Sequence, residues 1–496
     1  MDFQSVLVAA LLALTLIHGL RLLAKRSSNG KKLPPGPFPF PVFGNLHLLG
    51  NKPHVSISRL AGKYGPVMTL KLGMINTVVI SSPAMAKEAL QKQDLAFSTR
   101  LPPDAFRANN HCQFSVVWLP VASKWRALRK IMNTNIFSVN KLDTNEQLRA
   151  KKIQELIVYC QKNSEVGEAV DIGRAAFRTT LNLLSNTIFS KDLTDPYSDS
   201  AKEFRDLVWN MMLEAGKPNL VDYFPFLEKF DPQGIRRQMS GYFTKMFDLF
   251  QDLIDERLEE RKVKGNRSDD VLDSLLNISQ ERPEEIDRTH ILRMLMDLFA
   301  AGTDTSSSTL EWAMTELLKN PEVMAKVQVE LADVIGKGKL LHESDVTHLP
   351  YLQCVIKETF RIHPPVSMIQ RKVDHEVNLC GYTIPKDSQI LINVWAIGRD
   401  PKIWENPLVF NPERFWNLEM DFKGQDFELI PFGVGRRICP RLSMAVRTIP
   451  VMLGSLVNSF KWKLEGDIAP KDLDMEEKFG FTMAKGCPLR AIPISF

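Results

Sequence analysis

The chain has 496 residues, of which 44% are hydrophobic and 24% are charged, and its net charge is +5. This is the composition of a globular protein that can bury a large core. The charge is only mildly basic and no block of like charges occurs, so we expect no nucleic-acid partner. The six cysteines lack regular spacing and no CxxC or HExxH motif is present. Both facts argue against a disulfide framework or a zinc site and favour a reducing compartment.

At the N-terminus, residues 3–20 contain no Asp, Glu, Lys or Arg, and the apolar stretch continues around Arg21 to Ala24. This length is just enough to cross a bilayer as a helix. Basic residues follow it, and the positive-inside rule then places the rest of the chain in the cytosol. A cleaved signal peptide is the alternative, but the apolar stretch is long and lacks a small-residue cleavage site. We therefore expect residues 1–24 to form a single transmembrane helix.

A basic and proline-rich segment comes next, at residues 25–45. Five prolines fall within the eight residues from Pro34 to Pro41, and proline favours stiff, extended backbone. This composition is typical of a linker, and after a membrane anchor it predicts a rigid hinge. The remaining residues, 46–496, are expected to form one catalytic domain.

Helical periodicity dominates this domain. We expect helices at residues 56–64, 83–92, 124–135, 142–163, 204–215, 241–262, 288–318 and 321–335. An alternating pattern at residues 66–82 breaks at glycine and predicts a β-hairpin, and residues 376–395 predict further short strands. The sequence therefore predicts a mainly α fold with a small β portion.

The stretch "PFGVGRRICPRLS", residues 431–443, places a single cysteine, Cys439, behind two glycines and two arginines. A thiolate is a strong metal ligand, and adjacent arginines lower its pKa or bind the anionic edge of a cofactor. Glycine lets the backbone approach a flat group closely, and Phe432 can cover the sulfur. This pattern suits the axial ligand of a haem iron. An isolated cysteine is more often a buried structural residue, but the spacing F-x-x-G-x-R-x-C is highly specific.

With this motif, the chain resembles a plant microsomal cytochrome P-450, a haem-thiolate monooxygenase, along essentially its whole length. The resemblance implies the P-450 fold, haem b as cofactor, dioxygen as co-substrate and the endoplasmic reticulum membrane as location. It makes Cys439 the ligand of the haem iron, with Phe432 and Arg437 at the cofactor. The motif "WRALRK" supplies Trp125 and Arg129, which the family directs at a haem propionate.

A second motif, "ETFR", gives Glu358 and Arg361, and "FNPERF" gives Arg414. The resemblance implies that these three residues form an ion-paired structural lock. Alone, the E-x-x-R spacing is weak evidence, because such pairs are usually exposed on a helix surface.

The third motif, "AGTDTS", begins at Ala301 within a predicted helix, where Gly302 is a poor helix former. In the family, Ala301 and Gly302 face the cofactor and open a groove for dioxygen. Asp304 and Thr305 are then placed to relay protons to the bound oxygen. The alternative for Thr305 is an ordinary helix threonine that bonds back to the previous turn.

Electrons must come from another protein, since no flavin or dinucleotide motif is present. The resemblance implies an NADPH–cytochrome reductase as this partner. Its basic docking face is expected to include Lys124, Arg126, Lys130 and Arg436, although each of them could be an ordinary solvated charge.

Several stretches, among them "SVVWLPVASKWRALRK" and "GKPNLVDYFP", resemble the plant terpenoid-hydroxylase group that contains geraniol 8-hydroxylases. The resemblance implies hydroxylation of an allylic methyl group of geraniol, or of a related monoterpenol, in monoterpenoid or iridoid biosynthesis. The expected pocket is mostly apolar, as a small terpenoid alcohol requires. Its residues are Phe106, Phe114, Phe299, Ala301, Val366, Met368, Phe481 and Thr482. A diterpene, a phenolic compound or a tyrosine derivative remains an alternative substrate, because one fold serves many substrates.

Two features depart from the family pattern. Arg441 stands two residues after the cysteine, where the family has glycine, and residues 366–370 are one residue short and lack a proline. We expect Arg441 to crowd the cofactor site, so that Arg441→Gly raises haem retention and thermal stability, unless Arg441 points outward or finds an anionic partner. A haem-thiolate isomerase or dehydratase, which needs no reductase, is a rival function, but it would not need the Asp304–Thr305 relay. A non-catalytic haem-binding or terpenoid-binding protein is the other rival if Arg441 prevents haem from seating.

Overall fold

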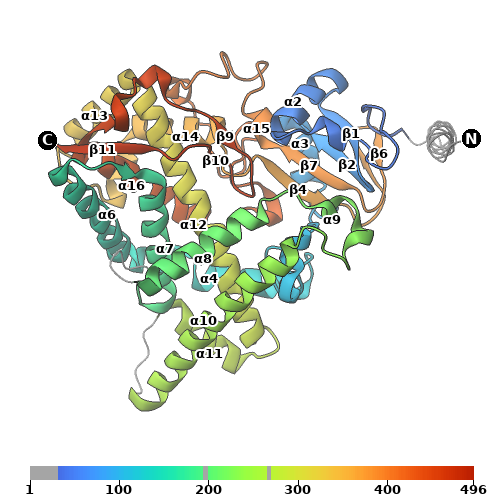
Figure 1. Cartoon of the computed structure of the whole chain (residues 1–496), viewed down its shortest axis with the longest axis horizontal. Coiled ribbons are helices and arrows are strands. Elements are labelled where there is room, and N and C mark those ends of the chain that lie inside the picture. The colour runs from blue at the N-terminus through green and yellow to red at the C-terminus, as the bar shows by residue number, and fades with distance from the viewer. Residues whose placement is uncertain (1–31, 194–198, 265–269) are drawn as a thin grey trace, which may run out of the picture.

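The computed structural model describes residues 32–193, 199–264 and 270–496. The predicted anchor and the first seven residues of the predicted hinge lie outside this part of the chain. Within the described ranges, no helix is long and apolar enough to cross a membrane. Figure 1 shows a large helical region on one side and a smaller sheet region, formed by early and late parts of the chain, on the other. The predicted mainly α fold with a small β portion is confirmed.

The helical region is built around α12. The helices are α2 (Pro53–Tyr64), α3 (Pro83–Lys87), α4 (Ser123–Asn135), α5 (Val139–Thr144), α6 (Glu146–Val166), α7 (Ile172–Phe189), α8 (Asp199–Ala215), α9 (Leu220–Tyr223), α10 (Ile235–Lys264), α11 (Val271–Glu281), α12 (Arg288–Lys319), α13 (Pro321–Val334), α14 (Pro350–Ile362), α15 (Val394–Ile397) and α16 (Leu442–Ser459).

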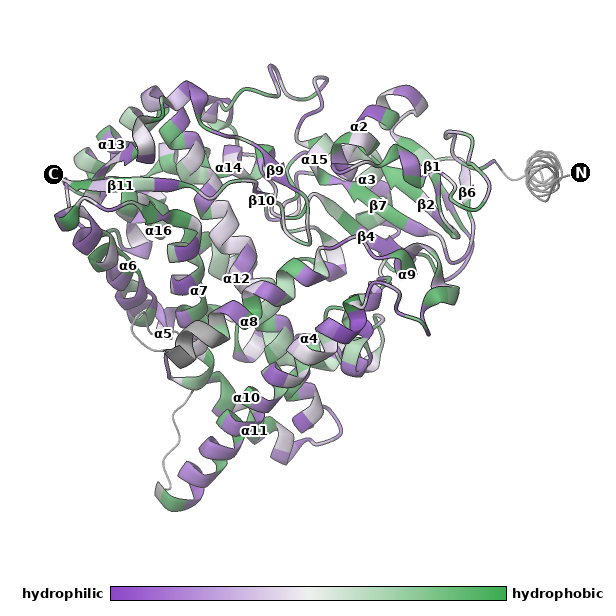
Figure 2. Ribbon diagram, in the orientation of Figure 1, coloured by the Kyte–Doolittle hydropathy of each residue, from purple (hydrophilic) through white to green (hydrophobic). Residues whose placement is uncertain are grey.

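The largest sheet has the order β1-β2-β7-β4, in which β2 and β7 are parallel and the other pairs are antiparallel. The smaller sheets have the orders β5-β6, β3-β11-β8 and β9-β10. The strands are β1 (Val67–Leu72), β2 (Ile75–Ile80), β3 (Val170–Asp171), β4 (Met368–Lys372), β5 (Val377–Leu379), β6 (Tyr382–Ile384), β7 (Gln389–Asn393), β8 (Phe460–Leu464), β9 (Glu477–Lys478), β10 (Ala484–Lys485) and β11 (Arg490–Ser495). The predicted hairpin is β1–β2, and β2 and β7 are largely hydrophobic in Figure 2.

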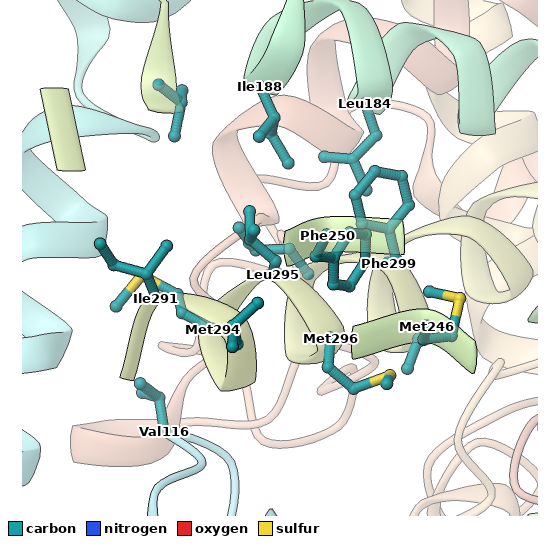
Figure 3. Packing of buried hydrophobic residues seen from close by; sticks show 14 of the residues in the cluster. Val116, Leu184, Ile188, Met246, Phe250, Ile291, Met294, Leu295, Met296 and Phe299 are labelled. Carbon is teal, nitrogen blue, oxygen red and sulfur yellow. The ribbon is translucent and has the colours of Figure 1, made fainter. Parts of the chain in front are cut away.

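Helix α12 passes through the middle of the helical region and is buried along most of its length. It begins where the Asp287 side chain accepts a hydrogen bond from the His290 amide at 2.9 Å, a typical N-cap. Pro321 is the first residue of α13, and a proline there prevents α12 from continuing. Figure 3 shows Phe299 of α12 among side chains of α7 and α10, including Leu184 and Phe250. This packing holds α12 rigidly against the helices around it.

The expected helices did not include α7, α9, α11, α14, α15 or α16, and the predicted helix at 142–163 is divided. Helix α7 is buried on nearly all sides, so it lacks the one-sided apolar pattern that reveals a surface helix. Helix α11, which is short, was also missed. The expected helix at 142–163 is split into α5 and α6 at Asn145, whose side chain donates to the Lys141 carbonyl at 2.9 Å. An asparagine that binds nearby backbone competes with helix continuation.

The described part of the proline-rich segment lies along β1. The Thr69 amide donates to the Pro35 carbonyl at 2.8 Å, and the Asn45 amide donates to the Lys71 carbonyl at 2.5 Å. A Cβ atom on Gly36 would stand 1.9 Å from the Thr69 carbonyl oxygen, so only glycine allows this close approach. The segment is therefore fastened to the sheet region over this length.

Candidate active site

Residues 431–443 form a tight loop that leads into α16. A short turn, η7 (Gly435–Arg437), precedes Cys439, and the Cys439 amide donates to the Phe432 carbonyl at 2.9 Å. Gly435 has a φ of +68°, and a Cβ atom there would stand 2.7 Å from a neighbouring backbone oxygen. Only glycine fits this turn without strain. The loop therefore holds the Cys439 thiol in a defined place.

Cys439 borders a cavity between this loop and α12. Water molecules can be centred in about 40 Å³ of it, which is room for a few of them. On the α12 side it is lined by Ala301 and Thr305, one helical turn apart. Other lining residues are Thr180, Leu183, Ser306, Thr309, Phe360, Pro365, Phe432, Arg441, Met444, Ala445, Thr448 and Ile449. The structure thus brings the predicted ligand and the predicted oxygen-side residues to one cavity.

The Cys439 thiol is influenced both by burial and by nearby guanidinium charges. Burial raises its pKa, while the Arg441 amide, the Arg441 charge and then the Arg129 charge act in the opposite direction. A buried thiol stays protonated until a metal ion or a strong cation stabilises the thiolate. The site therefore favours metal ligation by Cys439 over a free nucleophilic thiolate.

Arg441 stands at the N-cap of α16 and reaches across the cavity to α12. A Cβ atom on Gly302 would lie 1.5 Å from Arg441 Nη1, so the guanidinium rests directly on this glycine. Arg441 Nη2 contacts Met444 Sδ at 3.5 Å, and burial lowers the pKa of Arg441 to about 10. The side chain points inward, into the space between Cys439 and α12.

Four buried or partly buried arginines gather beside the cavity, and all of their described hydrogen bonds go to carbonyl oxygens. They are Arg100, Arg129, Arg371 and Arg437. Burial, followed by the charge of Arg100, lowers the pKa of Arg437 to about 9 and that of Arg371 well below its usual range. None of the four forms an ion pair with a carboxylate of the described ranges. Such a cluster is costly unless an anion balances it.

The predicted cofactor-side residues hold this region together. Arg129 donates to the Ile438 carbonyl at 2.6 Å, next to the cysteine. Arg437 donates to the Ser98 carbonyl at 3.0 Å and lies over the ring of Trp125, 4.8 Å from its centre. The Trp125 indole donates to the backbone at residue 116. Arg129, Arg437 and Trp125 therefore lie around the cysteine loop.

The predicted relay residues occupy adjacent positions on α12. Thr305 Oγ1 donates to the Ala301 carbonyl at 3.0 Å, which is the back-bonded geometry of an ordinary helix threonine. Its oxygen lone pairs remain able to accept a hydrogen bond. Burial raises the pKa of Asp304, so its carboxyl group keeps a proton to higher pH than an exposed aspartate.

The predicted lock residues are in direct contact. Arg361 binds both carboxylate oxygens of Glu358, at 2.6 and 2.7 Å, and both side chains are fully buried. Arg414 Nε lies 3.0 Å from the same carboxylate. Arg361 also donates to the Pro407 carbonyl at 2.8 Å. The network joins α14 to the long loop after α15, which precedes the cysteine loop.

The predicted substrate residues separate into two groups. Phe106 and Phe481 face each other, with ring centres 5.2 Å apart. Ser308 of α12 donates to the Met483 carbonyl at 2.7 Å, and the Met483 amide donates to the Pro365 carbonyl at 2.9 Å. These bonds bring the segments that carry Val366, Met368 and Thr482 to α12.

The other group lies elsewhere. Phe299 is fully buried and packs against Phe189, Phe204 and Phe250, on the side of α12 that faces α7, α8 and α10. Phe114 packs edge-on against His290, near the start of α12, at 5.4 Å. Phe299 is thus part of the core of the helical region.

The predicted reductase face is partly exposed. Arg126 and Lys130 are exposed on α4, while Lys124 Nζ donates to the Glu284 carbonyl at 2.7 Å. Arg436 is paired with Asp94 at 2.8 Å.

Sequence reasoning missed several residues beside the site. Arg100 and Arg371 complete the arginine cluster, and no local motif marked them. Asp297 was also missed, although it lies one helical turn before Ala301. Its buried carboxylate accepts hydrogen bonds from Ser115 Oγ and contacts His111 Nε2 at 3.0 Å. An aspartate in an otherwise apolar stretch of a predicted helix was the available signal.

The family model described as Cytochrome P450 matches residues 34–486. The chain belongs to the cytochrome P-450 family. It is 65% identical over 494 residues to geraniol 8-hydroxylase from Catharanthus roseus, with 99% of both chains covered. It is 63% identical over 492 residues to geraniol 8-hydroxylase from Swertia mussotii, with 99% of both covered. Its identity to geranylhydroquinone 3''-hydroxylase from Arnebia euchroma is 52% over 497 residues, covering 100% of this chain and 99% of that one.

This cytochrome P-450 is a monooxygenase, and the cofactor of its family is haem. The donors around the cavity fit haem: Cys439 offers a thiol for the iron, and the arginine cluster, which no carboxylate in the described part of the chain pairs, suits the two carboxylates of the porphyrin. One feature conflicts with the fit, because the Arg441 side chain lies in the same space. The recognition of a plant P-450 close to the geraniol 8-hydroxylase group is confirmed.

Proposed function

We propose that this P-450 hydroxylates an allylic methyl group of geraniol, or of a closely related monoterpenol, in monoterpenoid or iridoid biosynthesis. The observation that carries the reaction type is the cavity lined together by Cys439, Ala301 and Thr305. The substrate is supported by the two relatives named geraniol 8-hydroxylase.

In this proposal Cys439 holds the haem iron, with Phe432 beside the sulfur. Arg129 and Arg437, joined by Arg100 and Arg371, hold the two haem carboxylates. This assignment gives the four arginines the anionic partner that the described residues do not supply. When bound, haem supplies the oxygen-activating chemistry, which an anionic thiolate ligand promotes by favouring cleavage of the O–O bond.

Thr305 and Asp304 handle protons on the α12 side of the cavity. The Thr305 hydroxyl donates to the Ala301 carbonyl, so its oxygen can accept a hydrogen bond from a water or an oxygen-bound proton. Burial raises the pKa of Asp304, so its carboxyl group keeps a proton to higher pH than an exposed aspartate does. Asp304 therefore delivers protons from solvent, and Thr305 passes them into the cavity.

The substrate is held by apolar side chains. The facing rings of Phe106 and Phe481 are 5.2 Å apart, and the segments of Val366, Met368 and Thr482 are bonded to α12 nearby. An apolar wall with one hydroxyl suits a small terpenoid alcohol. Phe114 and Phe299, by contrast, act on the pocket only through the packing of the helices that carry them.

We propose that residues 1–24 anchor the chain in the endoplasmic reticulum membrane, with residues 25–45 as the hinge and residues 46–496 as the cytosolic catalytic domain. An exposed apolar surface, formed by hinge residues and by residues that adjoin the hinge, supports this arrangement. Its residues, from 54% to 74% exposed, are Phe38, Phe40, Phe43, Met74, Phe226 and Phe230. The Phe43 and Phe224 rings are in contact, and the Met74 amide donates to the Tyr223 carbonyl, so these segments adjoin one another. Such a surface is suited to a lipid headgroup region.

Electrons for the reaction come from an NADPH–cytochrome reductase. The exposed cations Arg126 and Lys130 on α4, together with Lys124 and Arg436, form a basic surface for an acidic partner. Arg436 and Arg437 are neighbours in the loop before Cys439, so a partner bound at this surface would sit close to the proposed iron ligand.

A reduced carbon monoxide difference spectrum of the full chain tests the reaction type. A thiolate-type band is the expected result, and its absence from haem-loaded protein would reject the haem-thiolate assignment. The next step is turnover with a panel of monoterpenols in the presence of reductase and NADPH, in which geraniol should be preferred.

A hydroxylase of another plant metabolite is the second candidate. The chain is also 51% identical over 495 residues to 7-ethoxycoumarin O-deethylase from Helianthus tuberosus. Relatives at about 50% identity are therefore named for quite different substrates. A phenolic or diterpene substrate that is turned over faster than geraniol would favour this alternative. A non-catalytic role would follow only if Arg441 kept haem out altogether.

A further inference from the structure

The position of Arg441 depends on a glycine in another helix. A Cβ atom on Gly302 would stand 1.5 Å from Arg441 Nη1 and 2.5 Å from its Cζ. These distances are far below van der Waals contact, so no other residue at position 302 could accommodate the guanidinium where it lies. Arg441 and Gly302 are therefore a matched pair across the cavity.

Among the residues that the structure describes, no carboxylate forms an ion pair with Arg441. The side chain is 9% exposed, its Nε has no hydrogen-bond partner among the described residues, and its Nη2 contacts the Met444 sulfur at 3.5 Å. A guanidinium keeps its charge in proteins, so burial without a carboxylate is unfavourable. Within the described ranges, the side chain is held by the available space and not by an ion pair.

The backbone of Arg441 is fixed, so any displacement of this residue must come from its side chain. Its carbonyl accepts hydrogen bonds from the Met444 amide at 3.0 Å and the Ala445 amide at 2.9 Å, which fix its backbone at the start of α16. Since Arg441 and Cys439 line one cavity with Ala301 and Thr305, any large group bound to the Cys439 sulfur and facing α12 must enter the space that Arg441 crosses.

We propose that the Arg441 side chain and haem compete for this space, so that haem loads only when Arg441 leaves Gly302. The proposal rests on the assignment of Cys439 as the haem ligand. Arg441 is then a self-occluding residue, which slows haem uptake and weakens haem retention without taking part in the reaction. The arginines on the other side of the cysteine, among them Arg129 and Arg437, point to backbone carbonyls and do not cross the cavity.

The first test measures haem uptake by the full chain expressed under haem limitation. Arg441→Gly should take up added haem faster than the parent. It should also bind haem roughly tenfold more tightly, as relief of an overpacked site implies. Arg490→Gly, at an exposed arginine of β11 that is paired with Glu465, is the control and should load like the parent. Equal or weaker haem retention by Arg441→Gly would overturn the proposal.

The second test uses Gly302→Ala to examine the matched pair, with the melting temperature of the haem-limited chain as readout. With Arg441 present, the new methyl group meets the guanidinium, so the melting temperature should fall. With Arg441→Gly, it should rise, because alanine is the better helix former. The same shift in both backgrounds would refute the contact. If Arg441→Gly loads haem but gives no thiolate-type spectrum, the assignment of Cys439 as the haem ligand is wrong. The spectrum therefore tests the ligand, whereas haem uptake tests the competition between Arg441 and haem.

Discussion

Both carboxylate oxygens of Asp297 accept the hydroxyl hydrogen bond of Ser115, at 2.7 and 2.8 Å. The same carboxylate lies 3.0 Å from His111 Nε2, and all three side chains are buried. Asp297 belongs to α12, one turn before Ala301, whereas His111 and Ser115 belong to the segment that carries Phe106. This contact therefore sets how the proposed substrate wall sits over the proposed oxygen site.

Replacing Asp297 with alanine should loosen that segment. It leaves the Ser115 hydroxyl and the His111 ring without their buried partner, which costs about 1–3 kcal/mol of unfolding free energy per unsatisfied group. The melting temperature should fall, and the KM for geraniol should rise more than kcat falls. Asp248→Ala, at an exposed position of α10, is the control. A melting temperature equal to that of the control would show that the contact has no structural weight.

Cys439→Ser should abolish the thiolate-type carbon monoxide spectrum, because a hydroxyl is a far weaker iron ligand than a thiolate. Cys354→Ser, at a buried cysteine of α14 away from the cavity, should retain it. An unchanged spectrum in the Cys439 variant would remove the assignment on which the proposed function rests.

Thr305→Ala should keep haem and substrate binding but lower the fraction of NADPH electrons that reach product, with the rest appearing as peroxide or water. Thr303 is a matched control, since it also bonds back to the previous turn, at 2.9 Å from the Phe299 carbonyl, but does not line the cavity. Thr303→Ala should leave this coupling intact. Equal coupling in the parent and in Thr305→Ala would mean that Thr305 serves only the helix.

Glu358→Gln should destabilise the fold severely. The change leaves Arg361, which is fully buried, and Arg414 without their carboxylate, and removing one partner of a buried pair costs about 3–5 kcal/mol. Reduced haem content and a lower melting temperature are expected, while Glu405→Gln at an exposed site should have neither effect. If the Glu358→Gln variant has the same melting temperature as the parent, the ion-paired lock is dispensable for stability.

Asp222 predicts a pH dependence. Burial and then the charge of Asp104 raise its pKa to about 6. The folded chain therefore holds a proton that the unfolded chain has released, and the unfolding free energy falls as pH rises from about 4 to about 6. Asp222→Asn keeps an oxygen for the Asp104 amide, which lies 2.7 Å away, but cannot ionise.

The variant should therefore lose less stability than the parent over this interval. The comparison is the slope of melting temperature against pH for the two proteins, with Asp248→Asn as a control that should follow the parent. Identical slopes in the parent and Asp222→Asn would show that Asp222 does not titrate in this window.

The sequence was most informative where local pattern determines structure. The β1–β2 hairpin follows from an alternating pattern that is broken at Gly73. The cysteine loop could be expected because its turn accepts only glycine at Gly435. Helix α7 escaped detection because it is buried on nearly every side. Pattern reasoning depends on a polar face to reveal the period, and α7 lacks one.

The site residues show the same division. Cys439, Glu358 and Arg361 sit in compact motifs, so their positions could be expected from sequence. Arg100 and Arg371 join the arginine cluster from separate loops and strands, and only the fold brings them together. Phe299 lies only two residues before Ala301 in the chain. A helix turns each successive side chain by about 100°, so Phe299 packs among the aromatic rings of α7, α8 and α10.

The central claim is tested most directly by the NADPH-dependent product that the full chain, reconstituted with reductase, forms from geraniol, expressed per bound haem. The account predicts one main product that carries a new hydroxyl on an allylic methyl group and that disappears in Cys439→Ser. Haem-loaded protein with a thiolate-type spectrum that leaves geraniol unchanged, while oxidising another terpenoid or phenolic compound, would contradict it.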